Sequence, residues 1–238
     1  MNAHTPVEPS REESNTSRAV LKRMLQVVIT YLILAAILFI SSGGLNWIWA
    51  WAYLGLGLGI LVINVVILPA ELVAERGQPR NNVKRWDRVL TTLAGVPTLG
   101  VPIVAGLDER LGWSPQLVPA IHLVGLTFFV LGQGLFSWAM ASNKYFSTCV
   151  RIQVDRGHTV ATSGPYRYVR HPGYAGYIVS SLGMSLALGS LWAIIPAGLI
   201  ACLLVVRTVL EDRTLQDELP GYKEYAQRVR YRLLPGIL

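Results

Sequence analysis

Residues 24–41 read MLQVVITYLILAAILFIS, an apolar run that contains no charged side chain. A helix needs about 20 mostly apolar residues to cross the hydrocarbon core of a bilayer, which is about 30 Å thick. Gly43 and Gly44 interrupt the run, and a second apolar run covers residues 47–69. This succession predicts two consecutive membrane-spanning helices.

The same pattern recurs further along the chain. Four more apolar runs cover residues 89–107, 117–140, 174–188 and 191–210. The run at 174–188 is short, because its length as a helix is about 22 Å at 1.5 Å per residue. The sequence therefore predicts an all-α, polytopic membrane protein with about six transmembrane helices, embedded in the lipid bilayer.

The composition excludes several other classes of protein. Of the 238 residues, 52% are hydrophobic and 15% are charged, whereas soluble domains carry about 25% charged residues. Such hydrophobicity excludes disorder for most of the chain, and two cysteines are too few for a disulfide scaffold. The sequence contains no CxxC or HExxH motif, so we expect no metal site. We also expect no nucleic-acid partner.

The positive charges indicate how the chain crosses the membrane. If the six runs are helices, every Lys and Arg except Arg110 lies in the tails or in connections on one side. Cytoplasmic loops are enriched in these residues, so both termini are predicted to be cytoplasmic. Residues 1–23 are then a flexible cytosolic tail, residues 24–140 a four-helix transmembrane region, and residues 141–238 a region with a cytosolic loop, a helical hairpin and a carboxyl-terminal tail.

Reactive side chains are concentrated around Pro172. Proline suits the first turn of a helix, so a helix is predicted to begin there. The free N–H groups of a helix start can hold a carboxylate or a phosphate. Nearby aromatic rings, such as those of Tyr166 and Tyr174, suit a cation. A zwitterion such as S-adenosylmethionine matches both features, but composition alone favours the alternative, a belt of interfacial Tyr and Arg side chains that anchors the helix ends.

A second candidate lies at the end of the last apolar run. Arg207 and Glu211 are four residues apart and share one helix face, which Leu215 continues. A charge at the membrane end of an apolar helix is costly unless it has a partner or a task. The pair is therefore either a local salt bridge or part of a site.

The motifs in this half of the chain resemble those of a known family. Residues 164–174 read GPYRYVRHPGY, which is similar to the RHPxY segment of the isoprenylcysteine carboxyl methyltransferase family. That family, to which membrane methyltransferases of phospholipid amines are related, continues with two helices and an acidic EExxL motif. Here residues 211–215 read EDRTL. The resemblance covers roughly residues 140–238, so 141–238 is expected to be a methyltransferase region.

The resemblance implies S-adenosylmethionine as the cofactor. The residues that it places at the cofactor are His158, Thr159, Val160, Ala161, Tyr166, His171, Pro172, Gly173 and Tyr174. It places Arg207 and Glu211 at the methyl acceptor, as the catalytic pair. Arg151 stands where the family has a cofactor-contacting Gln, and Gln153 follows two residues later.

The expected activity is transfer of a methyl group to a lipophilic acceptor at the cytoplasmic membrane face. The acceptor is a prenylcysteine-type carboxylate, an amine or a thiol. One alternative is an NADPH-dependent reductase of the sterol-reductase type, in which a basic cluster of Arg151, Arg156, Arg167 and Arg170 holds the 2′-phosphate. A further alternative is a non-catalytic scaffold or transporter, although polar residues within the spans, such as Asn64 and Gln133, are few.

Overall fold

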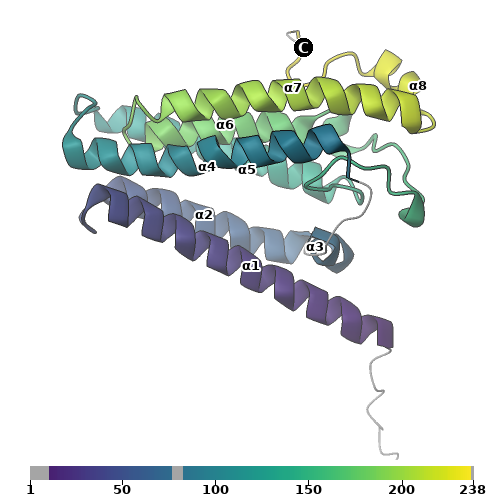
Figure 1. Ribbon diagram of the computed structural model, residues 1–238, viewed down its shortest axis with the longest axis horizontal. Helices are drawn as coiled ribbons and strands as arrows, with labels where there is room; N and C mark the ends of the chain where they lie inside the picture. Colours follow the sequence, from purple (N-terminus) through teal and green to yellow (C-terminus); the bar gives the residue numbers. More distant parts are fainter. Residues whose placement is uncertain (1–10, 77–82, 237–238) are drawn as a thin grey trace, which may run out of the picture.

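The computed structural model describes residues 11–76 and 83–236, and every regular element within them is helical (Figure 1). The α-helices are α1 (Arg11–Ser42), α2 (Ile48–Ile67), α3 (Ala70–Arg76), α4 (Arg85–Leu111), α5 (Pro119–Ala141), α6 (Pro172–Ala187), α7 (Ile194–Glu218) and α8 (Tyr222–Arg228). Two short 3-10 turns, η1 (Val154–Arg156) and η2 (Gly164–Arg167), lie between α5 and α6. The predicted all-α fold is confirmed.

All six apolar runs lie in helices. Among the described helices, five are long and apolar enough to cross a membrane, namely α1 from Ser17 onward, α2, α4, α5 and α7. Helix α6, which holds the run at 174–188, has 16 residues and is too short by the same measure. The structure thus supports five spans instead of the predicted six.

Although α6 is short, its far end reaches the loop between α4 and α5. The hydroxyl of Ser190 donates a hydrogen bond to the buried carboxylate of Asp108. The Leu191 N–H donates to Ser114 Oγ at 3.0 Å, and the Ser114 N–H donates to Asp108 at 2.6 Å. These bonds fasten the turn between α6 and α7 to the end of α4. Because that turn is short, α6 and α7 are antiparallel neighbours.

The predicted amino-terminal tail is partly wrong. Helix α1 begins at Arg11, so residues 11–23, which were expected to be flexible, are helical. Extending an existing helix costs far less than nucleating a new one, and the apolar run that follows supplies that existing helix. Residues 1–10 lie outside the described part of the chain.

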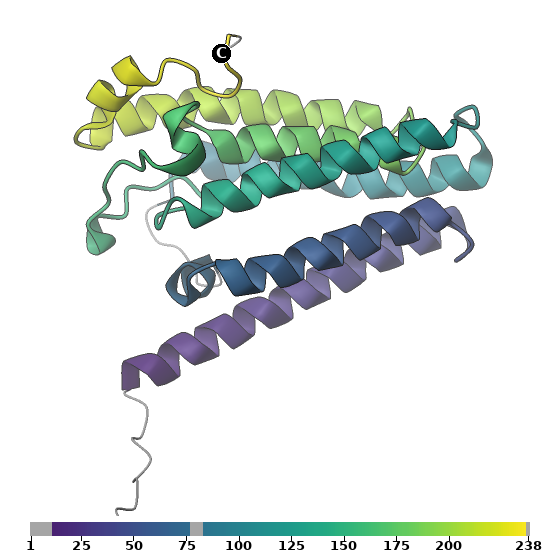
Figure 2. The ribbon, with the colours of Figure 1, turned by 180° about the vertical axis from the view of Figure 1, so that it is seen from behind.

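The helices of the bundle form two layers, and one of them is packed more closely than the other. Helices α1 and α2 lie on one side of a compact group formed by α4, α5, α6 and α7 (Figures 1 and 2). In the compact group α5 and α6 approach closely, because a Cβ at Gly132 would lie 2.5 Å from the Gly176 carbonyl oxygen. Small residues permit such approach between membrane helices.

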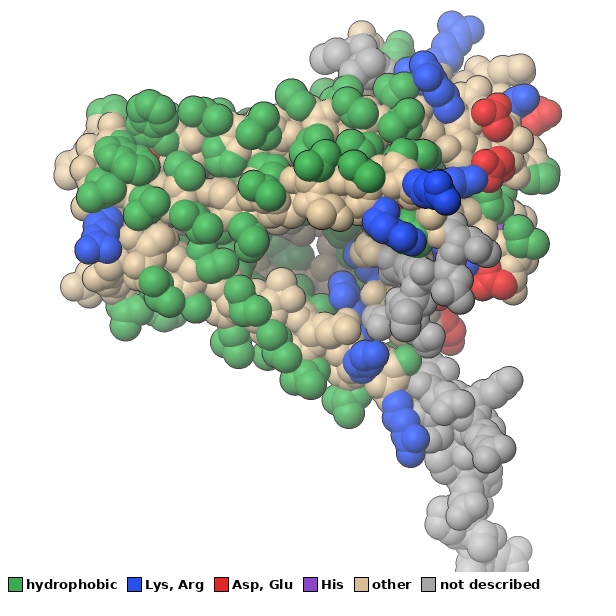
Figure 3. Space-filling model, in the orientation of Figure 1, with side chains coloured by type: hydrophobic (Ala, Val, Ile, Leu, Met, Phe, Trp, Pro, Cys, Tyr) green, Lys and Arg blue, Asp and Glu red, His purple; other side chains and the backbone are tan. Residues whose placement is uncertain are grey.

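Charged side chains gather at one end of the bundle. Figure 3 shows most of the Lys and Arg side chains visible on this face at the end where α7 leaves the compact group, with green apolar side chains along the rest. The loop between α5 and α6, the short helix α3 and helix α8 lie at the same end (Figure 1). The chain therefore builds a polar cap on one end of an apolar bundle.

Candidate functional site

A pocket lies in the polar cap, where α6 begins and α7 extends out of the compact group. The cavity has a volume of about 100 Å³ and is open to solvent. The predicted residues that line it are His158, Thr159, Val160, Ala161, Tyr166, His171, Gly173, Tyr174 and Glu211. Pro172 is buried behind this wall, and Arg207 lies beside it. Segments that are far apart in the sequence thus converge on one pocket.

The first turn of α6 forms one wall of the pocket. Pro172 is the first helical residue, as predicted, and the Tyr174 N–H donates to the His171 carbonyl oxygen at 3.1 Å. Gly173 lies against the ring of Phe146, where a Cβ would come within 2.8 Å of the ring carbons. The rings of His171 and Tyr174 are parallel, with centroids 5.8 Å apart. This wall combines aromatic faces with a helix start.

Helix α7 forms the opposite wall through Glu211. The Tyr174 hydroxyl donates a short hydrogen bond to Glu211 Oε2. Four residues earlier, the Arg207 guanidinium lies over the Tyr174 ring, 5.2 Å from its centroid. Arg207 and Glu211 therefore face the same side chain, as their spacing predicts. The ion-pair partner of Arg207, however, is Asp87 of α4, at 2.8 Å, instead of Glu211.

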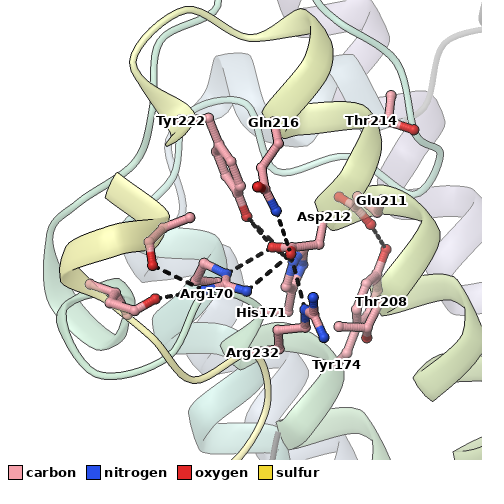
Figure 4. Close-up of polar contacts among 12 residues, drawn as sticks. Arg170, His171, Tyr174, Thr208, Glu211, Asp212, Thr214, Gln216, Tyr222 and Arg232 are labelled. Atoms are coloured by element: carbon pink, nitrogen blue, oxygen red, sulfur yellow. Dashed lines mark hydrogen bonds and ion pairs between the residues drawn. The ribbon is translucent and has the colours of Figure 1, made fainter. Parts of the chain in front are cut away.

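Behind the pocket, Asp212 is the centre of a buried polar cluster (Figure 4). Arg170 donates to both of its carboxylate oxygens, from Nε at 2.8 Å and from Nη2 at 3.0 Å. Arg232, Tyr222 and Gln216 donate to the same carboxylate at 3.0, 3.0 and 2.9 Å. A buried charge is tolerated when it is paired and hydrogen-bonded in this way.

The same cluster docks the carboxyl-terminal tail. Nη1 of Arg170 donates to the carbonyl oxygens of Val229 and Arg230, at 2.8 and 3.0 Å. The backbone N–H of His171 donates to the Arg232 carbonyl oxygen at 2.8 Å. Residues after α8 are therefore held against the start of α6, and Tyr222 and Tyr225 complete the pocket wall.

The loop between α5 and α6 contributes a neutral imidazole. His158 Nδ1 accepts a hydrogen bond from the Gln153 N–H at 3.3 Å, which leaves the ring proton on Nε2. Burial, together with the charges of Arg151 and Arg156, lowers the pKa of His158 to about 4. At neutral pH this residue is uncharged and presents one N–H donor.

Arg151, at the family's Gln position, and Gln153, two residues later, both line the pocket. Arg151 forms ion pairs with Glu75 and Asp155, each at 3.1 Å. Gln153 is buried, and its side chain donates to the Tyr145 carbonyl oxygen at 2.7 Å. Both side chains therefore also hold the loop in place.

Sequence reasoning missed the roles of Arg170 and Asp212. The available signal was their position inside the two motifs, since Arg170 precedes His171 and Asp212 follows Glu211. It also missed Asp87, which lies in a charged stretch with no motif. Local patterns carry no information on pairs that are 42 and 120 residues apart.

Comparison with known proteins shows that this region is similar to a known family. Residues 123–217 match the isoprenylcysteine carboxyl methyltransferase (ICMT) family. A rice protein named probable protein-S-isoprenylcysteine O-methyltransferase is 28% identical over 117 residues, which are 46% of this chain and 59% of that protein. An Arabidopsis thaliana relative, protein-S-isoprenylcysteine O-methyltransferase B, is 31% identical over 113 residues, 44% of this chain and 55% of the relative.

A human relative, protein-S-isoprenylcysteine O-methyltransferase, is 30% identical over 131 residues, which are 51% of this chain and 44% of that protein. The chain thus spans about half the length of these curated relatives. The match includes α6 and α7 up to Asp217, the two helices that face each other across the pocket. Residues 123–217 of this chain are therefore similar to the isoprenylcysteine carboxyl methyltransferase family.

Proposed function

We propose that the protein is a membrane methyltransferase that uses S-adenosylmethionine to methylate the carboxylate of a lipophilic, prenylcysteine-type acceptor at the cytoplasmic membrane face. The observation that carries this proposal is the convergence of the RHPGY segment and Glu211 on one pocket. The family match covers these same elements, and its relatives are named for this reaction.

The pocket fits the chemistry of the donor. Aromatic rings of His171 and Tyr174 suit the positive sulfonium, and Glu211 adds a carboxylate that accepts a hydrogen bond from the Tyr174 hydroxyl. The neutral His158 offers an N–H to a polar group of the ligand. When bound, S-adenosylmethionine supplies a methyl group on a positively charged sulfur.

The reaction needs no proton transfer when the acceptor is a carboxylate. An acceptor oxygen forms a bond to the methyl carbon while the bond from that carbon to sulfur breaks, giving a methyl ester and S-adenosylhomocysteine. The task of the protein is then to align the reactants and to exclude water. An amine or thiol acceptor must lose a proton, for which Glu211 is the nearest base.

Arg207 is suited to hold the acceptor. Asp87 and the Thr148 carbonyl oxygen engage two of its N–H groups, at 2.8 and 2.9 Å, and a guanidinium has five. The remaining N–H groups would bind the acceptor carboxylate through charge-assisted bonds. Figure 3 shows a hollow between α1 and the compact group, and an apolar acceptor tail would enter by this side, from the bilayer.

The reductase alternative fits the arginines less well. Of the four side chains that could hold a 2′-phosphate, Arg167 is exposed, and the other three are already engaged within the protein. Arg151 pairs with Glu75, Arg156 donates to Gln153 at 2.7 Å, and Arg170 binds Asp212. Free basic groups are what recognition of that phosphate requires.

The test is methyl transfer by the purified full-length chain in detergent. We expect labelled S-adenosylmethionine to methylate N-acetyl-S-farnesylcysteine. Glu211→Ala and His171→Ala should each lower the rate at least 100-fold without loss of helicity by circular dichroism. Glu109→Ala is the control, because this exposed carboxylate lies at the opposite end of α4. Normal turnover by both pocket variants would overturn the site assignment.

A further inference from the structure

Asp87 is a buried acid that the family match does not include. It lies in the first turn of α4, and its side chain is fully buried. The matched region begins only at residue 123. A buried carboxylate is costly unless its oxygens are paired, so the partners of Asp87 indicate what it does.

Each carboxylate oxygen of Asp87 has one partner near the pocket. Oδ1 accepts from Arg207 Nε at 2.8 Å, and Oδ2 accepts from the Val150 N–H at 2.7 Å. Val150 is buried and lines the pocket. One side chain from α4 therefore joins α7 to the pocket wall.

The loop between α5 and α6 also binds Arg207 directly, through a residue two positions before Val150. The Thr148 carbonyl oxygen accepts from Arg207 Nη2 at 2.9 Å. With Asp87 on Nε and Thr148 on Nη2, one edge of the planar guanidinium is held at two points. Its carbon then lies over the Tyr174 ring, at 5.2 Å from the centroid. Such a guanidinium has one orientation before any ligand arrives.

We propose that Asp87 is a positioning residue for the acceptor, which holds the guanidinium of Arg207 with its free N–H groups toward the carboxylate that becomes methylated. This inference rests on the proposed function. Because the orientation exists before binding, the acceptor does not have to bring about that ordering itself. Asp87 acts through Arg207, and its other hydrogen bond is to the Val150 N–H of the loop.

The experiment compares two ligands that differ in one group. N-acetyl-S-farnesylcysteine carries the carboxylate, and its carboxamide carries a neutral group of the same size. The KM of the acid and the inhibition constant of the amide are measured for the wild type and for Asp87→Asn. Asp155→Asn is the matched control, because Asp155 is an exposed acid paired with a pocket arginine, Arg151.

In the wild type we expect the acid to bind at least tenfold better than the amide. In Asp87→Asn we expect this preference to fall at least fivefold and the KM of the acid to rise about tenfold. The dissociation constant of S-adenosylhomocysteine should stay within twofold of the wild-type value. Asp155→Asn should keep the preference for the acid. A general loosening of the fold would instead weaken the binding of the acid, the amide and S-adenosylhomocysteine to a similar extent.

A double variant shows whether Asp87 acts through Arg207. In Arg207→Ala the preference for the acid should already be lost, and adding Asp87→Asn should change it less than twofold. If Asp87→Asn alone does not bind S-adenosylhomocysteine, Asp87→Glu is measured instead. That variant keeps the charge but displaces it by one methylene, and it should lower the preference partially.

An unchanged preference for the acid in Asp87→Asn would overturn the positioning role. An equal loss of affinity for the acid, the amide and S-adenosylhomocysteine would overturn it as well. Failure of the proposed function has a different result, because the wild type itself would then methylate no acceptor. A wild type that is active beside an Asp87→Asn protein with the same acid preference would refute only the inference about Asp87.

Discussion

The two layers of the bundle are built by different means. In the most apolar window of α1, 6% of residues are buried within the chain, and in α2 17% are. The corresponding share is 33% in α5 and 28% in α7. Helices that face outward along most of their surface need only apolar side chains, which a bilayer accepts. Helices that face each other need matching shapes and paired charges.

The site belongs to the compact layer. The pocket lies between the ends of α6 and α7, and Asp212 behind it binds groups from three parts of the chain. The amino-terminal half contributes single residues to the site. Glu75 and Asp87 bind Arg151 and Arg207, and the Arg76 guanidinium lies over the ring of Phe146. The comparison therefore predicts large effects in the compact layer and small ones on exposed surfaces.

The largest effect is expected at Asp212. Asp212→Ala leaves the buried Arg170 without its carboxylate, and breaking a buried ion pair in this way costs about 3–5 kcal/mol. The free energy of unfolding, measured by titration with sodium dodecyl sulfate in mixed micelles, should fall by that amount. Asp217→Ala, an exposed acid of the same helix, should change it by less than about 0.5 kcal/mol. Equal effects of the two substitutions would refute the cluster's role.

A smaller effect is expected from adding one methyl group between α5 and α6. In Gly132→Ala the Cβ would lie 2.5 Å from the Gly176 oxygen and the Ser180 nitrogen. Overpacking costs about 1–3 kcal/mol, which thermal unfolding in detergent would report. Gly134→Ala in the same helix and Gly59→Ala in α2 meet no atom within 4 Å. If these control variants lost as much stability as Gly132→Ala, the close packing of α5 against α6 would not be the cause.

The sequence predicted much of this architecture because the deciding signals are local. Apolar runs of sufficient length predicted the positions of the long helices, and Pro172 predicted the start of α6. The short helix α3 and the helical residues 11–23 were not predicted, since neither belongs to an apolar run. Of the six predicted membrane spans, five are helices that are long and apolar enough to cross a bilayer. The sixth, α6, has only 16 residues and packs along α5.

For the candidate site, sequence motifs predicted which segments meet but not how they are joined. The RHPGY segment, apart from the buried Pro172, lines one pocket together with Glu211. The pairs Asp87–Arg207 and Arg170–Asp212 join residues distant in the sequence, and no spacing rule predicts such contacts. Their roles in binding and catalysis remain predictions until variants are assayed.

The pocket loop should respond to acid through His158. Its pKa is about 4 in the folded chain against 6.5 in the unfolded one. Between these values only the unfolded chain binds the proton, so stability is full above pH 6.5 and falls as the pH drops toward 4. His158→Gln should lack this part of the pH dependence. Unfolding curves of both proteins from pH 7.5 to 4 would test it, and identical profiles would contradict the assignment.

The smallest effect is expected at an exposed ion pair. Lys84 Nζ lies 2.6 Å from Glu218 Oε1, and both side chains are partly exposed. Such pairs contribute about 0–1 kcal/mol, so Glu218→Gln should be nearly neutral in mixed-micelle unfolding, and added salt should remove the remainder. If Glu218→Gln lowered the free energy of unfolding as much as Asp212→Ala, the smaller role assigned to the exposed acid Glu218 would be contradicted.

The most direct measurement is calorimetry on the detergent-purified chain with S-adenosylhomocysteine and, in parallel, with NADPH. We expect S-adenosylhomocysteine to bind with one-to-one stoichiometry and NADPH to produce no heat of binding. Tyr174→Ala, which removes the ring between Arg207 and Glu211, should weaken S-adenosylhomocysteine at least tenfold. Binding of NADPH without binding of S-adenosylhomocysteine would contradict a methyl-donor pocket between α6 and α7.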